Sequence, residues 1–343
     1  MKQRLLTGDT PTGKLHLGHW IGSLENRVQM QNDYECYFLI ANIHAFTTRA
    51  DKPAEIRQNT LDIALDYLSV GIDPSKSTIF ILSEIPAIAE LTFLFSMLLP
   101  YPRVMRNPTL KEEIRIKELG DNYSFGFLLY AVDQVADILA FRAHVVPVGE
   151  DQIPHLEMTR EVARRFNQLY CDSDTPLFPI PEVKLGKVKR LVGIGHPNEN
   201  GQLPKMSKSL NNAIFLSDTP DVISQKVKAM YTDPKRLRAS DPGTVENNPL
   251  WIFHEAFNSD KAWVAEAEEK YRTGQIGDVE CKKKLIDVLV ALTEPMRQRR
   301  KLYEDDPAQL LKILQEGTER ANAVAEETLA AVKKAMQQDF FYK

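Results

Sequence analysis

The chain has 343 residues, of which 43 % are hydrophobic and 26 % are charged, as is ordinary for a globular protein. Its formal net charge of −4 excludes a polycation, so any contact with nucleic acid must come from a local basic patch. The three cysteines lie far apart and form neither a zinc nor a disulfide pattern. The longest apolar run, residues 85–102, is interrupted by Glu90 and is too short to span a bilayer. We therefore expect a cytoplasmic enzyme with no structural metal and no membrane segment.

The first two thirds of the chain alternate between strand and helix patterns. Strands are expected in four apolar segments, residues 4–7, 36–46, 77–83 and 143–149. Apolar residues at helical spacing predict helices over about residues 17–31, from Pro53 to just before Gly71, and after residue 149 through about Leu169. Because strands and helices alternate, we expect a parallel sheet covered by helices on both faces.

The last third of the chain, after about Phe215, has only helical patterns. The sequence therefore predicts an α/β nucleotide-binding domain followed by an all-helical domain. The expected division is residues 1–205 for the catalytic domain, 206–305 for the helical domain and 306–343 for C-terminal helices. Whether those last helices pack back on the catalytic domain is left open.

The most informative short segment is TGDTPTGKLHLGHWIGSL, residues 7–24. It predicts a tight turn that leads into a helix, with His16 and His19 at the start of the helix. The free N–H groups and partial positive charge of a helix N-terminus favour a phosphate there, and Gly18 allows close approach to the backbone. The glycines do not have the dinucleotide spacing G-x-G-x-x-G. Taken alone, the segment is equally consistent with surface histidines on an ordinary turn.

A second segment, NGQLPKMSKSLNN at residues 200–212, contains Lys205, Met206, Ser207, Lys208 and Ser209. Two lysines three positions apart on a glycine- and proline-bounded loop make a mobile clamp for a triphosphate. Alone, this loop would be interpreted as a solvated basic surface. Together, H-L-G-H and K-M-S-K-S resemble the HIGH and KMSKS motifs, the two hallmarks of class I aminoacyl-tRNA synthetases.

The resemblance extends to bacterial tryptophanyl-tRNA synthetases over nearly the whole chain. The stretches that carry it are residues 41–47, 70–84, 126–141, 146–167 and 230–249. The resemblance implies a Rossmann-like catalytic domain and a helical domain that binds the tRNA anticodon. It also implies that L-tryptophan is activated with ATP to Trp-AMP and transferred to tRNA(Trp), with release of pyrophosphate and AMP, in protein synthesis. Mg²⁺ and a homodimer are implied as well, without a metal bound by the protein itself.

The resemblance also assigns residues to ATP. Catalytic roles fall to His16, His19, Lys205, Lys208 and Lys111, the last of which could equally be a helix-surface charge. The expected ATP contacts are Thr10, Pro11, Thr12, Gly18, His19, Gly149, Glu150, Asp151, Leu191, Lys205, Met206, Ser207, Lys208 and Ser209. Thr10 stands where the family often has a longer polar side chain, which weakens that assignment.

For tryptophan, the resemblance places the acceptor of the indole N–H at Asp137. A carboxylate in this apolar helical stretch would be costly unless it is paired; without the motif it would be interpreted as a solvent-facing residue. Asp133, four residues earlier, is expected to matter much less. Gln134 stands where many members have methionine and makes the pocket edge more polar. The full set expected to contact tryptophan is Gly8, His44, Gln134, Asp137, Val146, Val148 and Gln152, with Gly8 leaving room for the ring.

The helical half contains two basic segments, residues 281–289 and 296–303, which are expected to follow tRNA phosphates. A solvated helix face is an equally good interpretation of any one of these cations. Three other functions stay open: a tyrosyl-tRNA synthetase, a simpler nucleotidyltransferase with H-x-G-H, and a non-catalytic relative that senses tRNA or tryptophan. The lysine loop and the helical half argue against the second, and two complete phosphate motifs argue against the third.

Overall fold

The computed structural model describes residues 2–116, 118–149, 152–185, 191–208, 210–234, 236, 238 and 240–341. At its centre is a parallel sheet of five strands in the order β3-β2-β1-β4-β5. The strands are β1 (Arg4–Asp9), β2 (Glu35–Ile40), β3 (Ser77–Ile81), β4 (Val145–Val148) and β5 (Glu182–Leu185). The chain builds outward from β1 to β3 and then returns to the other side of β1. The carboxyl ends of β1 and β4 therefore flank the switch point at which sheets of this kind bind ligands.

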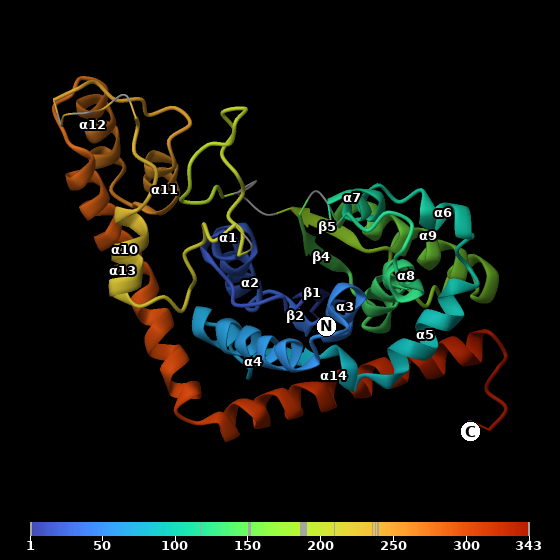
Figure 1. The fold of residues 1–343 in the computed structure, drawn as a ribbon. Coiled ribbons are helices and arrows are strands. Elements are labelled where there is room, and N and C mark those ends of the chain that lie inside the picture. Colours follow the sequence, from blue (N-terminus) through green and yellow to red (C-terminus); the bar gives the residue numbers. More distant parts are fainter. Residues whose placement is uncertain are drawn as a thin grey trace.

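Both faces of the sheet are buried, as the sequence predicts. Leu5 and Leu6 are neighbours in β1, yet they belong to two different hydrophobic cores on opposite faces. One core includes α4 (Pro53–Val70) and part of α13 (Asp278–Glu304). The other includes α5 (Pro86–Ser96), α8 (Phe125–Ala140), α9 (Ile153–Tyr170) and part of α14 (Pro307–Ala335). This is a Rossmann-like fold, and its elements are arranged as Figure 1 shows.

Three details of the sheet region differ from the prediction. The apolar run at residues 36–46 is a strand only to Ile40, and α3 (Asn42–Arg49) follows it. A continuous apolar run does not distinguish a strand from a buried helix, which explains the error. The expected helix at 17–31 is present as α1 (Leu17–His19), a π-helical segment (Trp20–Leu24) and α2 (Glu25–Met30). The short edge strand β5 has no clear sequence pattern and was not predicted.

Smaller helices complete the sheet domain, and the last third of the described chain is helical. These elements are a 3₁₀ turn (Leu82–Glu84), α6 (Tyr101–Met105), α7 (Pro108–Ile116), α10 (Pro220–Lys228), α11 (Pro249–Phe257) and α12 (Lys261–Arg272). In Figure 1, α13 descends from the helical half past α4, and α14 then runs beneath the sheet domain. None of the helices in the described ranges is both long and apolar enough to cross a membrane.

The long C-terminal helix α14 packs against β3, α5 and α8. The approach is close, because a Cβ at Gly317 would lie 2.0 Å from the carbonyl oxygen of Ile79. The C-terminal helix is thus physically part of the catalytic half. The domain boundaries at residues 205 and 305 stay a prediction.

Candidate active site

The H-L-G-H segment begins its helix directly after the turn that follows β1. The Nδ1 atom of His16 accepts a hydrogen bond from the backbone N–H of Gly18 at 3.1 Å, and Nδ1 of His19 accepts from the N–H of His16 at 3.1 Å. In both rings, therefore, Nε2 carries the hydrogen. Burial, helped by the neighbouring ring and by Lys208, lowers the pKa of His16 to about 2. Burial also lowers the pKa of His19 to about 4. Both imidazoles are neutral near pH 7, so they offer N–H donors and no positive charge.

The lysine loop lies directly against this segment. The side chain of Lys208 donates from Nζ to the carbonyl oxygen of Gly13 at 2.7 Å. Met206 is buried beside Gly18, whose added Cβ would lie 3.7 Å from the Cβ of Met206. Burial lowers the pKa of Lys208 to about 8. The structure therefore brings the two expected phosphate motifs together, 195 residues apart in the chain.

Short backbone contacts hold the loop in place. The N–H of Leu17 donates to the oxygen of Ile214, and the N–H of Leu216 donates to the oxygen of Leu15, at 3.0 and 3.1 Å. The buried side chain of Asn212 accepts from the N–H of Ser207 at 2.7 Å and donates to the oxygen of Lys205 at 3.1 Å. Asn212 escaped the sequence interpretation because its role depends on these backbone partners and not on its own chemistry.

A buried ionic network, which no sequence motif indicates, supports the end of β1. Asp9 accepts from Arg27 at 2.6 Å and from the hydroxyl of Tyr67 at 2.7 Å. Although burial acts to raise it, Arg27 holds the pKa of Asp9 below its ordinary value. The network fixes the backbone immediately before the Thr10–Pro11–Thr12 turn, where ATP contacts are expected.

A second buried carboxylate links the same segment to the helical half. The Oδ2 atom of Asp66 accepts from the N–H of Leu15 at 2.7 Å, and its Oδ1 accepts from Arg300 at 2.6 Å. Arg300 is 4 % exposed and also contacts Asp62 and Glu304. Its neighbour Arg299 donates to the carbonyl oxygen of Ser69 at 2.6 Å. In this arrangement these arginines bind the protein itself, contrary to the expectation that they follow tRNA phosphates.

The expected indole acceptor lies in a polar cluster that joins α3 and α8. The Nε2 atom of His44 is 2.9 Å from Oδ2 of Asp133 and 3.5 Å from Oδ2 of Asp137. Thr92 donates to the other oxygen of Asp133 at 2.6 Å. Asp137 is 2 % exposed, and its Oδ1 has no hydrogen-bond partner in the described part of the chain. Asp137 thus faces the interior and not the solvent.

The charges in this cluster are strongly coupled. Burial raises the pKa of Asp137 to about 8, against the effect of His44. Although burial acts to lower it, Asp137 and Asp133 raise the pKa of His44. The donor atoms of the three residues lie within 4.8 Å of one another, so they are also the one described group able to hold a metal ion. Asp133, which is expected to matter much less for tryptophan, contacts His44 directly.

The other residues that are expected to contact the substrate tryptophan differ in their burial. Val146 is buried in the sheet core, whereas Val148, Gln134 and Gln152 are half-buried near the carboxyl end of β4 or on α8. A Cβ at Gly8 would lie 2.1 Å from the oxygen of Leu39. β2 therefore leaves no space for a side chain at Gly8. That Gly8 leaves room for the ring stays a prediction.

The other ATP residues are placed as follows. Pro11 and Leu191 are buried, Thr10 is half-buried and Thr12 is exposed. Gly149 directly follows β4, at the switch point. Lys111 is exposed on α7. Glu150, Asp151 and Ser209 lie outside the described residues.

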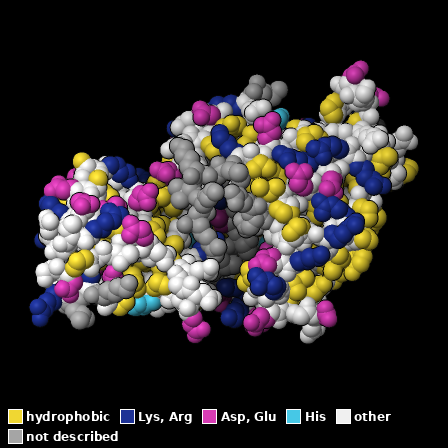
Figure 2. All heavy atoms as spheres, turned by 90° about the horizontal axis from the view of Figure 1, so that it is seen from above, with side chains coloured by type: hydrophobic (Ala, Val, Ile, Leu, Met, Phe, Trp, Pro, Cys, Tyr) yellow, Lys and Arg dark blue, Asp and Glu magenta, His cyan; other side chains and the backbone are white. Residues whose placement is uncertain are grey.

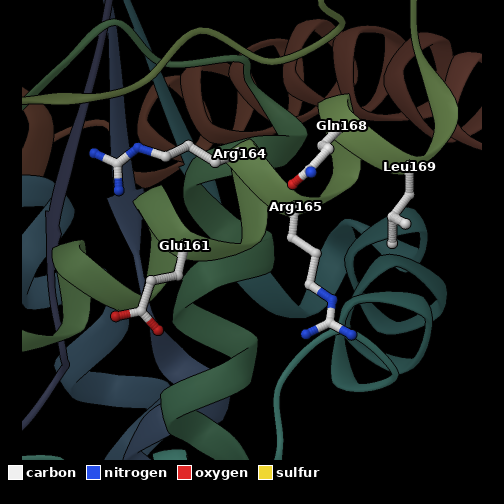
Figure 3. A pocket seen from close by; sticks show the side chains of 5 residues that line it. All are labelled: Glu161, Arg164, Arg165, Gln168 and Leu169. Carbon is white, nitrogen blue, oxygen red and sulfur yellow. The ribbon is translucent and has the colours of Figure 1, made fainter.

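A surface groove on α9 shares none of these residues. Its volume is about 410 Å³, and it is lined by Glu161, Arg164, Arg165, Gln168 and Leu169 (Figure 3). Seen from above, the molecule is hollowed between its two halves (Figure 2). The groove in Figure 3 is open surface on one helix and does not compete with the switch point as a candidate site.

A parallel sheet of order 3-2-1-4-5, with an imidazole pair and a lysine loop at the end of its first strand, defines a class I aminoacyl-tRNA synthetase. Comparison with known proteins agrees. The family model for tRNA synthetases class I (W and Y) matches residues 1–294, and the chain belongs to this family. Its function is that of a tryptophanyl-tRNA synthetase, which activates tryptophan with ATP and ligates it to tRNA(Trp).

Relatives of this function match nearly end to end. The tryptophan–tRNA ligase of Treponema pallidum (strain Nichols) is 47 % identical over 339 residues, covering 97 % of this chain and 96 % of its own. That of Clostridium longisporum is 45 % identical over 342 residues, with 99 % and 98 % covered. A crystal structure of the Campylobacter jejuni tryptophanyl-tRNA synthetase, complexed with ADP and tryptophan, has a TM-score of 0.84 at 29 % identity and covers 98 % of this chain and 100 % of that one.

Proposed function

We propose that tryptophan is activated at the switch point, with ATP lying over the H-L-G-H segment and under the lysine loop. The observation that carries this proposal is the contact of Lys208 with Gly13, which places a half-desolvated amine over the turn after β1. That the Campylobacter jejuni structure is complexed with ADP and tryptophan supports both ligands for this site. The ATP residues are those that the family resemblance assigns.

The chemistry follows from what these groups can do. An oxygen of the tryptophan carboxylate attacks the α-phosphorus of ATP, and the bond from that phosphorus to the bridging oxygen breaks to release pyrophosphate. Negative charge grows on the phosphate oxygens as the bond forms. The neutral rings of His16 and His19 donate N–H hydrogen bonds, and Lys205 and Lys208 supply positive charge. Lys208 has to exchange the Gly13 carbonyl for a phosphate oxygen, so part of its interaction is made only with ATP.

We propose that Mg²⁺ enters with ATP as part of the substrate. The one carboxylate described above at the end of β1, Asp9, is already bonded to Arg27 and Tyr67. The neighbouring groups are imidazole and amine donors, which suit phosphate better than a cation. An ion held mainly by the ATP phosphates and water fits this donor set.

For the amino acid, we propose that the unpartnered Oδ1 of Asp137 accepts the indole N–H. A buried acceptor without a partner is costly, and a tryptophan ring would satisfy it. Phenylalanine would leave the acceptor unpaired, a penalty that can reach about 10⁴-fold in a comparable site. His44, Gln134 and Gln152 complete the polar edge of this pocket in the proposal.

We also propose that the helical half, residues 206–305, binds the tRNA anticodon in the cytoplasm. The exposed Lys283 is a better candidate for phosphate contact than the buried Arg300. A homodimer is proposed because large apolar side chains are exposed on or next to α5, on α6 and near the end of α9. They are Phe93, Met97, Tyr101 and Leu169. Met97→Glu should then yield monomers in sedimentation equilibrium, whereas Leu302→Glu, at an exposed site on α13, should not.

The decisive experiment is ATP–pyrophosphate exchange measured with each of the twenty amino acids in turn. A response to tryptophan alone supports the proposed site, and Lys208→Ala should abolish most of that response. Exchange that persists undiminished in Lys208→Ala would remove the lysine loop from the site. Exchange with tyrosine in preference to tryptophan would contradict the pocket assignment.

A further inference from the structure

Asp133 and the proposed indole acceptor, Asp137, both lie close to the ring of His44. The ring of His44 comes from α3, and both carboxylates come from α8, one helical turn apart. The exposed fractions of the three side chains are 12 %, 18 % and 2 % for His44, Asp133 and Asp137. Asp137 is therefore the most deeply buried of the three.

The hydrogen at Nε2 of His44 goes to Asp133. The distance from Nε2 to Asp133 is 2.9 Å, inside the normal range, whereas the distance to Asp137 is 3.5 Å, beyond it. Thr92, on α5, fixes Asp133 by donating to its second oxygen at 2.6 Å. Both oxygens of Asp133 are thus occupied, while Oδ1 of Asp137 has no partner among the described residues.

We propose that Asp133 is a positioning residue for tryptophan selection, because it holds the N–H of His44 away from Asp137. The inference depends on the proposed role of Asp137. With Asp133 in place, the buried carboxylate of Asp137 stays free to accept the indole N–H. Without Asp133, His44 has one carboxylate left to bond, and its ring turns toward Asp137. The indole then competes with an internal donor for the same group.

The test compares tryptophan with its benzothiophene analogue, in which sulfur replaces the indole N–H. The assay is pyrophosphate exchange with Asp133→Leu, which removes both acceptors, and with Asp133→Asn, which keeps an acceptor for His44. Asp133→Leu should raise the KM for tryptophan about tenfold, the effect of losing one hydrogen bond. The KM for the analogue and the KM for ATP should not change. Asp133→Asn should recover most of the loss.

Two results with Asp133→Leu alone would overturn the proposal. One is an equal rise in KM for tryptophan and the analogue, which would indicate a packing role only. The other is an unchanged preference for tryptophan in Asp133→Leu. Because Asp133 acts through His44, Asp133→Leu should add nothing in a His44→Phe background, and an additive effect would also contradict it. If Asp137→Asn leaves the preference for tryptophan over the analogue intact, the proposed pocket itself is wrong, a different failure.

Discussion

The isosteric substitution Asp137→Asn should stabilise the protein and weaken tryptophan recognition at the same time. Burial raises the pKa of this carboxyl from its ordinary value of 3.8 to about 8 in the folded state. Between these values the folded state binds a proton that the unfolded chain releases, so the wild type loses stability as the pH rises from about 4 to 8. An asparagine has no proton to lose and escapes this penalty.

The magnitude follows from the same two pKa values. At about 1.4 kcal/mol for each pH unit between them, ionisation costs the folded state at most about 6 kcal/mol. Pairing with His44, whose pKa is raised in return, gives part of this back. We expect Asp137→Asn to raise the free energy of unfolding at pH 8 by about 1–3 kcal/mol, with a difference that vanishes below about pH 4. Above pH 8, where Asp137 is ionised, the KM for tryptophan should rise about tenfold, because a neutral acceptor bonds roughly half as strongly as a charged one.

Urea unfolding at several pH values, paired with pyrophosphate exchange, checks both halves of this prediction. Asp33→Asn is the control, since Asp33 lies exposed in the turn after α2 and should change neither quantity. A variant that is less stable than the wild type at pH 8 would refute the electrostatic reasoning. A stabilised variant that still rejects phenylalanine fully would refute the indole assignment alone.

Three further substitutions test other parts of the structure. Lys208→Ala should slow adenylate formation about a hundredfold in pre-steady-state kinetics while leaving tryptophan affinity unchanged, because its charge acts on phosphate. Arg300→Met should lower the free energy of unfolding by about 3–5 kcal/mol in urea titrations, since Asp66 would lose its buried partner; an unchanged stability would exclude the pair. Gly8→Ala should give little folded protein by circular dichroism, because its Cβ would lie 2.1 Å from Leu39.

The fold was predictable because it depends on local patterns. A buried strand such as β3 is indicated by a continuous apolar run. A helix such as α4 is indicated by the helical spacing of its apolar residues and by the glycine that follows it. The change from strand to helix after Ile40 was not predictable, because apolar residues continue through 41–46 with few interruptions. The strand β5, four residues long at the sheet edge, has no clear apolar pattern and could not be recognised.

The site was predictable where its chemistry is concentrated in short motifs, and unpredictable where it depends on distant partners. His16 and Lys208 could be named from sequence, yet nothing local says that the rings are neutral or that the amine rests on Gly13. Those properties come from burial and from a contact that spans 195 residues.

Arg300 shows the limit most clearly. In sequence it is one of several cations in a basic helical segment, where contact with tRNA is the natural hypothesis. Arg300 instead forms an ion pair with Asp66, 234 residues earlier in the chain. The second oxygen of Asp66 accepts a hydrogen bond from the N–H of Leu15, just before His16. One buried carboxylate therefore joins the helical half to the ATP segment. Removing either member of a buried ion pair leaves an uncompensated buried charge, which is strongly destabilising. A substitution at Arg300 should therefore destabilise the sheet domain, whether or not the basic segment also contacts nucleic acid.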